Sequence, residues 1–98
     1  MTTVPENWPF DDSPNVAVIT TRHVLEGAPI LLVSHDEEDG GWQFHTGGPA
    51  IEADARVVGL REIWVLDPSV ADLADLPLGW QAWRNTPAGP WRRKLRGG

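Results

Sequence analysis

The sequence contains no cysteine, no tyrosine and no long hydrophobic run, and these absences exclude several kinds of protein and site. Without cysteine there is no disulfide, thiolate metal site or thiol nucleophile, so an apolar core must stabilise the fold. No apolar run approaches the roughly 20 residues that cross a bilayer. The start of the chain also lacks the basic and apolar regions of a signal peptide. We therefore expect a cytoplasmic protein.

The charges are unevenly distributed along the 98 residues. The chain has 14 acidic and 8 basic residues, and four of the basic ones lie in the last seven positions. Residues 1–91 therefore carry a large excess of negative charge. Such a body repels nucleic acid and anionic membranes and attracts cationic partners. We expect no nucleic-acid or membrane partner, and the charge favours a basic protein.

The length and the sequence pattern predict one domain with two end segments. Residues 1–14 contain three prolines and read as an irregular N-terminal segment, residues 15–91 as a single domain, and residues 92–98 as a basic flexible tail. Apolar and β-branched patterns predict strands at 16–20, 30–35, 42–45 and 80–84, with 56–58 as a further candidate. Apolar spacing predicts short helices at 22–26, 60–66 and 68–76. The expected fold class is α+β, a small mostly antiparallel sheet of four or five strands with short helices packed on one face.

Residues 30–45 give the clearest local pattern, a β-hairpin. Two apolar runs flank residues 36–41, a segment with sequence DEEDGG that we call the acidic turn. Two glycines at its end permit the sharp reversal that a hairpin requires. The acidic turn is therefore expected to project from the end of the sheet.

Two stretches resemble a known family. They are residues 30–44 (ILLVSHDEEDGGWQF) and residues 66–80 (LDPSVADLADLPLGW). They are similar to a family of small bacterial proteins of unknown function that is grouped with immunity protein thirty-three of polymorphic toxin systems. The resemblance covers roughly residues 15–92. It implies an α+β fold and, by genomic association, neutralisation of a toxin, and it supplies no catalytic residue.

The acidic turn admits three interpretations: a solvated charged turn, a docking surface for a basic partner, or a metal site. The docking residues would be the four neighbouring carboxylates Asp36, Glu37, Glu38 and Asp39. The candidate metal ligands are His35, Asp36, Glu38 and His45, with the two histidines facing each other across the hairpin. A calcium loop is excluded because its twelfth position falls on Gly47, which has no carboxylate. We expect no cofactor.

Tryptophan is unusually abundant, with six residues in this short chain. Trp42 and Phe44 share one strand face and are expected in the core. Trp80 and Trp83 are three residues apart on a predicted strand, so they face opposite sides of the sheet. The residue left exposed is either part of a second packing layer or a contact for a protein partner, and Trp83 is the partner-binding candidate.

The sequence contains none of the common motifs that indicate an enzyme. Ser34 and His35 are neighbours on a predicted strand, so their side chains point to opposite faces and cannot form a catalytic pair. There is no phosphate-binding glycine loop and no nucleophile elbow. We expect a non-enzymatic protein-binding domain, and the family resemblance implies an immunity-type protein that neutralises a basic toxin domain through the acidic turn. The alternative is a metal- or small-molecule-binding domain centred on residues 35–41, and self-association also stays open.

Overall fold

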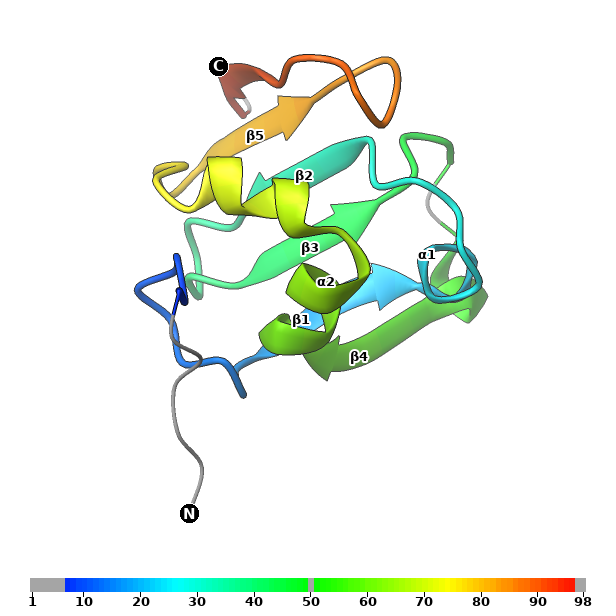
Figure 1. Ribbon diagram of the computed structural model, residues 1–98, viewed down its shortest axis with the longest axis horizontal. Helices are drawn as coiled ribbons and strands as arrows, with labels where there is room; N and C mark the ends of the chain where they lie inside the picture. Colours follow the sequence, from blue (N-terminus) through cyan, green and yellow to red (C-terminus); the bar gives the residue numbers. More distant parts are fainter. Residues whose placement is uncertain (1–6, 50, 97–98) are drawn as a thin grey trace.

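A six-stranded mixed sheet forms the framework of the molecule (Figure 1). The computed structural model describes residues 7–49 and 51–96. The strand order is β4-β1-β3-β2-β5-β6, with β1 and β3 parallel and the other neighbouring strands antiparallel. The strands are β1 (Ala17–Thr21), β2 (Leu32–His35), β3 (Trp42–His45), β4 (Ala55–Gly59), β5 (Trp80–Trp83) and β6 (Arg92–Leu95). The α+β class is confirmed, but the expected sheet of four or five mostly antiparallel strands is corrected to a six-stranded mixed one.

Two features account for the correction. Residues 92–95, expected to belong to a flexible tail, form β6 and pair with β5 along the edge of the sheet. The parallel pair arises because the chain crosses from β1 to β2 and then returns through the hairpin. This return inserts β3 between β1 and β2, antiparallel to β2 and therefore parallel to β1.

Short helices connect the strands, and those at 22–25, 60–66 and 68–73 lie where the apolar spacing predicts them. Helix α1 (Arg22–Leu25) begins at Thr21, whose hydroxyl accepts a hydrogen bond from the backbone N–H of Val24 over 3.3 Å. The 3-10 helix η1 (Glu52–Asp54) precedes β4. Helix α2 (Leu60–Leu66) and the 3-10 helix η2 (Pro68–Leu73) follow β4 and are separated by Asp67. Within the described residues, no helix is long and apolar enough to cross a membrane.

The core lies between one face of the sheet and the pair α2 and η2, which Figure 1 shows crossing that face. Alternate residues of β2 and β3 point into it, and the largest of them are Trp42 and Phe44, which are buried as expected. Leu60 and Ile63 of α2 cover the sheet from above. In the described part of the chain no helix covers the opposite side, which we call the open face.

The described end of the N-terminal segment has no regular structure but is attached to the core. Phe10 is buried and meets the ring of Trp42 edge to face, with the ring centroids 5.5 Å apart. Trp8 packs edge to face on Trp64 at 5.5 Å. The indole N–H of Trp8 donates to the backbone carbonyl of Asp12 over 2.7 Å. Aromatic contacts therefore fix a segment that its prolines keep out of helix and strand.

Candidate functional site

The acidic turn closes the hairpin between β2 and β3, as predicted. The backbone N–H of Asp36 donates to the carbonyl of Gly41 over 2.7 Å, and the N–H of Gly40 donates back to Asp36 over 2.9 Å. Gly40 has φ +72°, a left-handed conformation that glycine adopts without strain. These bonds hold the acidic side chains on a defined backbone.

The four carboxylates have different surroundings. Asp36 is half-buried, whereas Glu37, Glu38 and Asp39 are exposed. Asp39 accepts a hydrogen bond from the backbone N–H of Gly41 over 2.8 Å. Over residues 7–49 and 51–96, neither glutamate forms an ion pair or a side-chain hydrogen bond. The turn therefore offers three solvated negative charges next to one that is already engaged.

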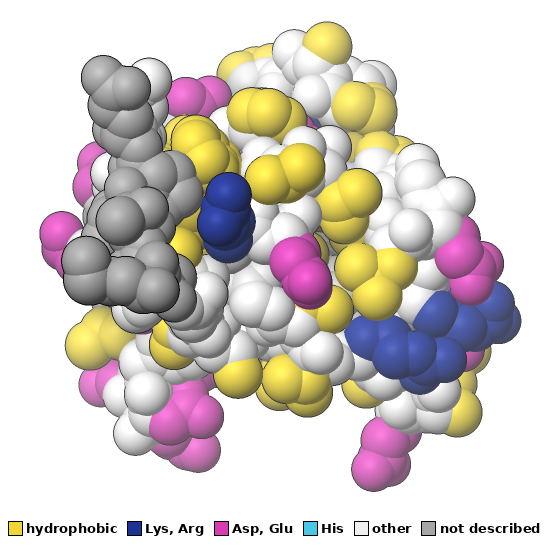
Figure 2. Space-filling view, turned by 60° about the horizontal axis from the view of Figure 1, so that its bottom comes forward, with side chains coloured by type: hydrophobic (Ala, Val, Ile, Leu, Met, Phe, Trp, Pro, Cys, Tyr) yellow, Lys and Arg dark blue, Asp and Glu magenta, His cyan; other side chains and the backbone are white. Residues whose placement is uncertain are grey.

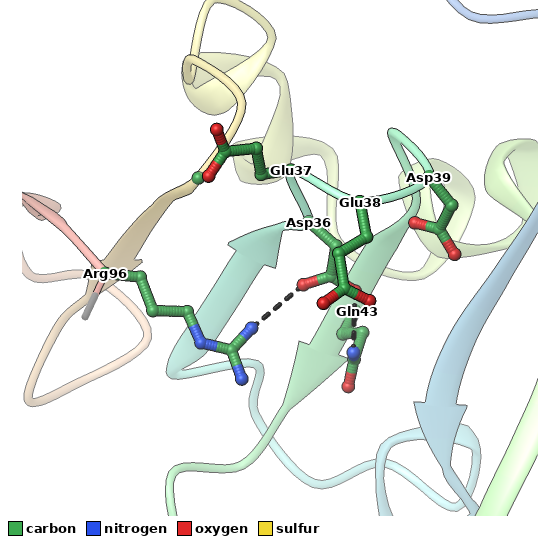
Figure 3. Close-up of a pocket in the computed structure, with 7 residues that line it drawn as sticks. Asp36, Glu37, Glu38, Asp39, Gln43 and Arg96 are labelled. Atoms are coloured by element: carbon green, nitrogen blue, oxygen red, sulfur yellow. Dashed lines mark hydrogen bonds and ion pairs between the residues drawn. The ribbon is translucent and has the colours of Figure 1, made fainter.

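A hollow of about 350 Å³ lies beside the acidic turn. Its lining residues are Asp36, Glu37, Glu38, Asp39, Gln43, Gly79 and Arg96. Asp36 accepts from Arg96 Nη1 over 2.9 Å at one oxygen and from Gln43 Nε2 over 2.7 Å at the other. In Figure 3, Glu38 points toward this pair while Glu37 and Asp39 point to either side. The hollow thus already holds one guanidinium against the carboxylates.

A short polar chain continues from this hollow across the open face. The amide nitrogen of Gln43 donates to Asp36, which turns the amide oxygen Oε1 toward His45. This oxygen can only accept, so His45 Nε2 donates to it over 3.0 Å. His45 Nδ1 is buried and has no hydrogen-bond partner among the described residues. Burial lowers the pKa of His45 below its ordinary value, since protonation would leave a buried charge with an unpaired donor. The neutral imidazole is therefore the favoured form.

The candidate metal ligands are not brought together. In the register of the hairpin His35 faces Trp42 and His45 faces Leu32, so the histidines lie at opposite ends and on opposite faces of the sheet. This corrects the expectation that they face each other. His35 stacks on Trp42 at 3.9 Å and its Nδ1 lies 2.7 Å from the carbonyl of Leu76. The described residues contain no group of three or more histidines and carboxylates placed to hold a metal ion.

Trp83 lies away from the acidic turn. As predicted, it faces the opposite side of the sheet from Trp80, and it is half-buried on the open face. It pairs with Leu32, at the end of β2 distant from the turn, about 10 Å along the strand from the residue that pairs with Trp80. The ammonium of Lys94 lies 5.5 Å from its ring centroid. The structure therefore separates Trp83 from the carboxylates expected to act with it.

The basic residues near the C-terminus belong to the folded body, which changes the electrostatic interpretation. Arg92 and Lys94 pair in register with Trp83 and Gln81, and Arg96 extends the same row to the hollow. Arg93 points the other way and donates to Asp75 over 2.8 Å. The separation into an acidic body and a basic tail is thus wrong. The sequence RRKLR of residues 92–96 has no strand alternation that could have indicated this pairing.

No protein-family model, curated protein or solved structure matches the chain. The resemblance to the immunity-protein family therefore remains a prediction from the two stretches that carry it.

Proposed function

We propose that this chain is a non-enzymatic protein-binding domain that uses the acidic turn to bind a basic protein. The observation that carries the proposal is the contrast within the turn, where Glu37, Glu38 and Asp39 are exposed while Asp36 is held by Arg96. Exposed like charges on an ordered turn repel one another, and an approaching cation relieves that repulsion. The three exposed carboxylates are the binding residues, and Asp36 maintains the wall of the hollow.

Electrostatic attraction acts chiefly on the rate of association. Complementary charges accelerate encounter between proteins, and the acceleration decreases as salt screens them. Arg96 shows the type of group that the hollow accommodates, a guanidinium bound to a carboxylate over 2.9 Å. Arginine or lysine side chains of the partner would meet Glu37 and Glu38 without displacing it. Binding of this partner should therefore weaken steeply as ionic strength rises.

The resemblance to immunity proteins suggests the class of partner. A toxin domain that acts on an anionic substrate presents basic residues around its active site. The acidic turn would occupy that site in place of the substrate and exclude it. Neutralisation then requires no catalysis by this chain, only occlusion of the toxin.

An affinity capture with three baits tests the proposal. The first bait is the unaltered chain, and the second carries Glu37→Gln, Glu38→Gln and Asp39→Asn. The amide oxygen at position 39 can still accept the bond from Gly41, so the turn keeps its backbone geometry. The third bait is a matched control with the same loss of charge at exposed acidic residues elsewhere, Glu52→Gln, Asp72→Asn and Asp11→Asn.

The expected result is a basic protein retained by the first and third baits, lost from the second and released by salt. Retention by the second bait as well would contradict binding through the acidic turn. Equal loss from the second and third baits would show that net charge, and not this turn, determines binding.

A further inference from the structure

The two edges of the sheet have opposite character. At one edge, β6 (Arg92–Leu95) has three consecutive basic residues, and pairing with a copy of itself would bring like charges together. At the other edge, β4 (Ala55–Gly59) has the sequence ARVVG and contains no proline. No strand in the described ranges pairs with its outer side. A single charged side chain, Arg56, protects this edge, against three in β6, so β4 is the less protected of the two edges.

Backbone hydrogen bonds identify the groups that β4 directs outward. The N–H of Leu60 donates to the carbonyl of Val16 over 2.9 Å, which fixes the phase of the antiparallel ladder between β1 and β4. Hydrogen-bonded and non-hydrogen-bonded pairs alternate along such a ladder. Arg56 and Val58 therefore bond to β1. Both backbone groups of Val57 and the N–H of Gly59 point to the free edge. The N–H of Ala55 donates to the carbonyl of Glu52, and its own carbonyl already accepts from Arg56 Nη1 over 2.8 Å. The carbonyl of Gly59, the N-cap of α2, accepts the first hydrogen bond of that helix.

Val57 lies at the centre of β4. In an antiparallel pair of two β4 strands centred there, Val57 faces Val57 and Ala55 faces Gly59 of the other copy. The Val57 pair exchanges both hydrogen bonds. The N–H of Gly59 donates to the carbonyl of Ala55 in the other copy, which has a second lone pair besides the one that Arg56 occupies, so every free outward group is satisfied. We propose that the outer edge of β4 is a dimer interface, at which two copies of this chain join their sheets about a two-fold axis through Val57.

Exposed apolar side chains border β4 on both faces. On the open face Val57 is 70% exposed and its neighbour Ile19 is 39% exposed. On the helix side a groove of about 750 Å³ begins at Gly59 and runs along α2. The apolar residues in the groove include Leu25, Val65 and Leu66. Figure 2 shows hydrophobic side chains gathered on this side of the molecule, interrupted by charged ones.

The two-fold axis brings these apolar surfaces together. Antiparallel partners project their side chains to the same face, so both α2 helices lie on one side and their grooves face each other. Val57 and Ile19 of the two copies form a continuous apolar strip on the other side. The groove also contains Arg61 and Glu62, and two-fold symmetry allows each to meet its opposite charge. A second copy is thus complementary in backbone, apolar surface and charge.

Sedimentation equilibrium with two proline variants tests the interface. Val57→Pro removes an N–H that points outward, so it leaves the ladder to β1 intact. The matched control is Leu95→Pro. Arg96 N donates to the carbonyl of Gly79 over 2.8 Å, so by the same alternation the N–H of Leu95 points to the free edge of β6.

The expected result is a dimer for the unaltered chain and for Leu95→Pro, with association of Val57→Pro at least about tenfold weaker. A monomer for the unaltered chain up to about 1 mM overturns the proposal. Dimers of the same strength for Val57→Pro overturn it too.

Disulfide formation tests the register without relying on the proline variants. The chain has no cysteine, so a single introduced cysteine reports only on contact between copies. Opposed residues in a hydrogen-bonded pair have Cα atoms about 5.5 Å apart, within the range of a disulfide. Val57→Cys should therefore cross-link under mild oxidation. Ala55→Cys should not, because its own copy lies more than about 10 Å away along the strands. Equal cross-linking of the two variants would overturn the pairing about Val57.

Discussion

Arg96 Nη1 lies 2.9 Å from Asp36 Oδ1, which joins residues 60 positions apart in the sequence. Solvent reaches the pair mainly from the arginine, whose side chain is 55% exposed, whereas the aspartate side chain is 20% exposed. An ion pair of this kind contributes at most about 1 kcal/mol to stability. Its larger effect is on charge, because it places one cation in the hollow beside the acidic turn.

Removal of that cation should strengthen recognition of a basic partner. Arg96→Gln leaves the hollow with a greater excess of negative charge, so we expect association several-fold faster at low salt. The matched control is Arg92→Gln, which removes the same charge at the other end of β6, beside Trp83. Stopped-flow measurement of the association rate would compare them. Slower association of Arg96→Gln, or an equal gain in Arg92→Gln, would contradict the role of the hollow.

Arg84 should be important for stability. Its side chain is 2% exposed and donates to the Ile30 carbonyl over 3.0 Å, to the Ser69 hydroxyl over 2.9 Å and to Asp67 over 2.8 Å. Its guanidinium carbon also lies 4.1 Å from the ring centroid of Trp91. Arg84→Met leaves these acceptors unpaired and should lower the free energy of unfolding by about 3–5 kcal/mol. Urea denaturation measures the loss.

Arg92→Met provides the control for that measurement. Arg92 is the first residue of β6, and its side chain is exposed. Its replacement should change stability by less than about 0.5 kcal/mol. A similar loss in both variants would show that charge in general, and not the buried contacts of Arg84, stabilises the fold.

His45 should make stability depend on pH in a definite direction. Burial holds the pKa of the folded state below the ordinary value of about 6.5 that applies to the unfolded chain. Between these two values the unfolded state binds more protons, so this contribution to stability is present above about pH 6.5 and is lost as the pH falls toward the folded pKa. His45→Gln should remove this dependence. Urea denaturation at a series of pH values measures it.

Titration of the imidazole by NMR checks the cause directly. The His45 signals should titrate below about pH 6.5. A midpoint at or above that value would contradict the assignment of a buried neutral ring.

Local patterns predicted those elements whose cause is local. The hairpin, the short helix after β1 and the two short helices on either side of Asp67 all follow from neighbouring residues. The burial of Trp42 and Phe44 followed from strand alternation in the same way. Such features need only residues close in sequence, which a single chain displays directly.

Features that depend on distant segments were missed. The strand β6 forms only because β5 offers it an edge, and its basic composition resembles a solvated tail. The contact between Arg96 and Asp36 exists only after that pairing. The expected approach of His35 and His45 failed because the register places them on opposite faces, and register is fixed by the turn and not by residue type.

The association rate of the captured partner tests the central claim most directly. It should be measured over a series of salt concentrations for the unaltered chain, the variant with amides at Glu37, Glu38 and Asp39, and the matched control with amides at Asp11, Glu52 and Asp72. We predict association at least about tenfold slower, with a weaker dependence on salt, for the first variant only. An unchanged rate in that variant would contradict recognition through the acidic turn.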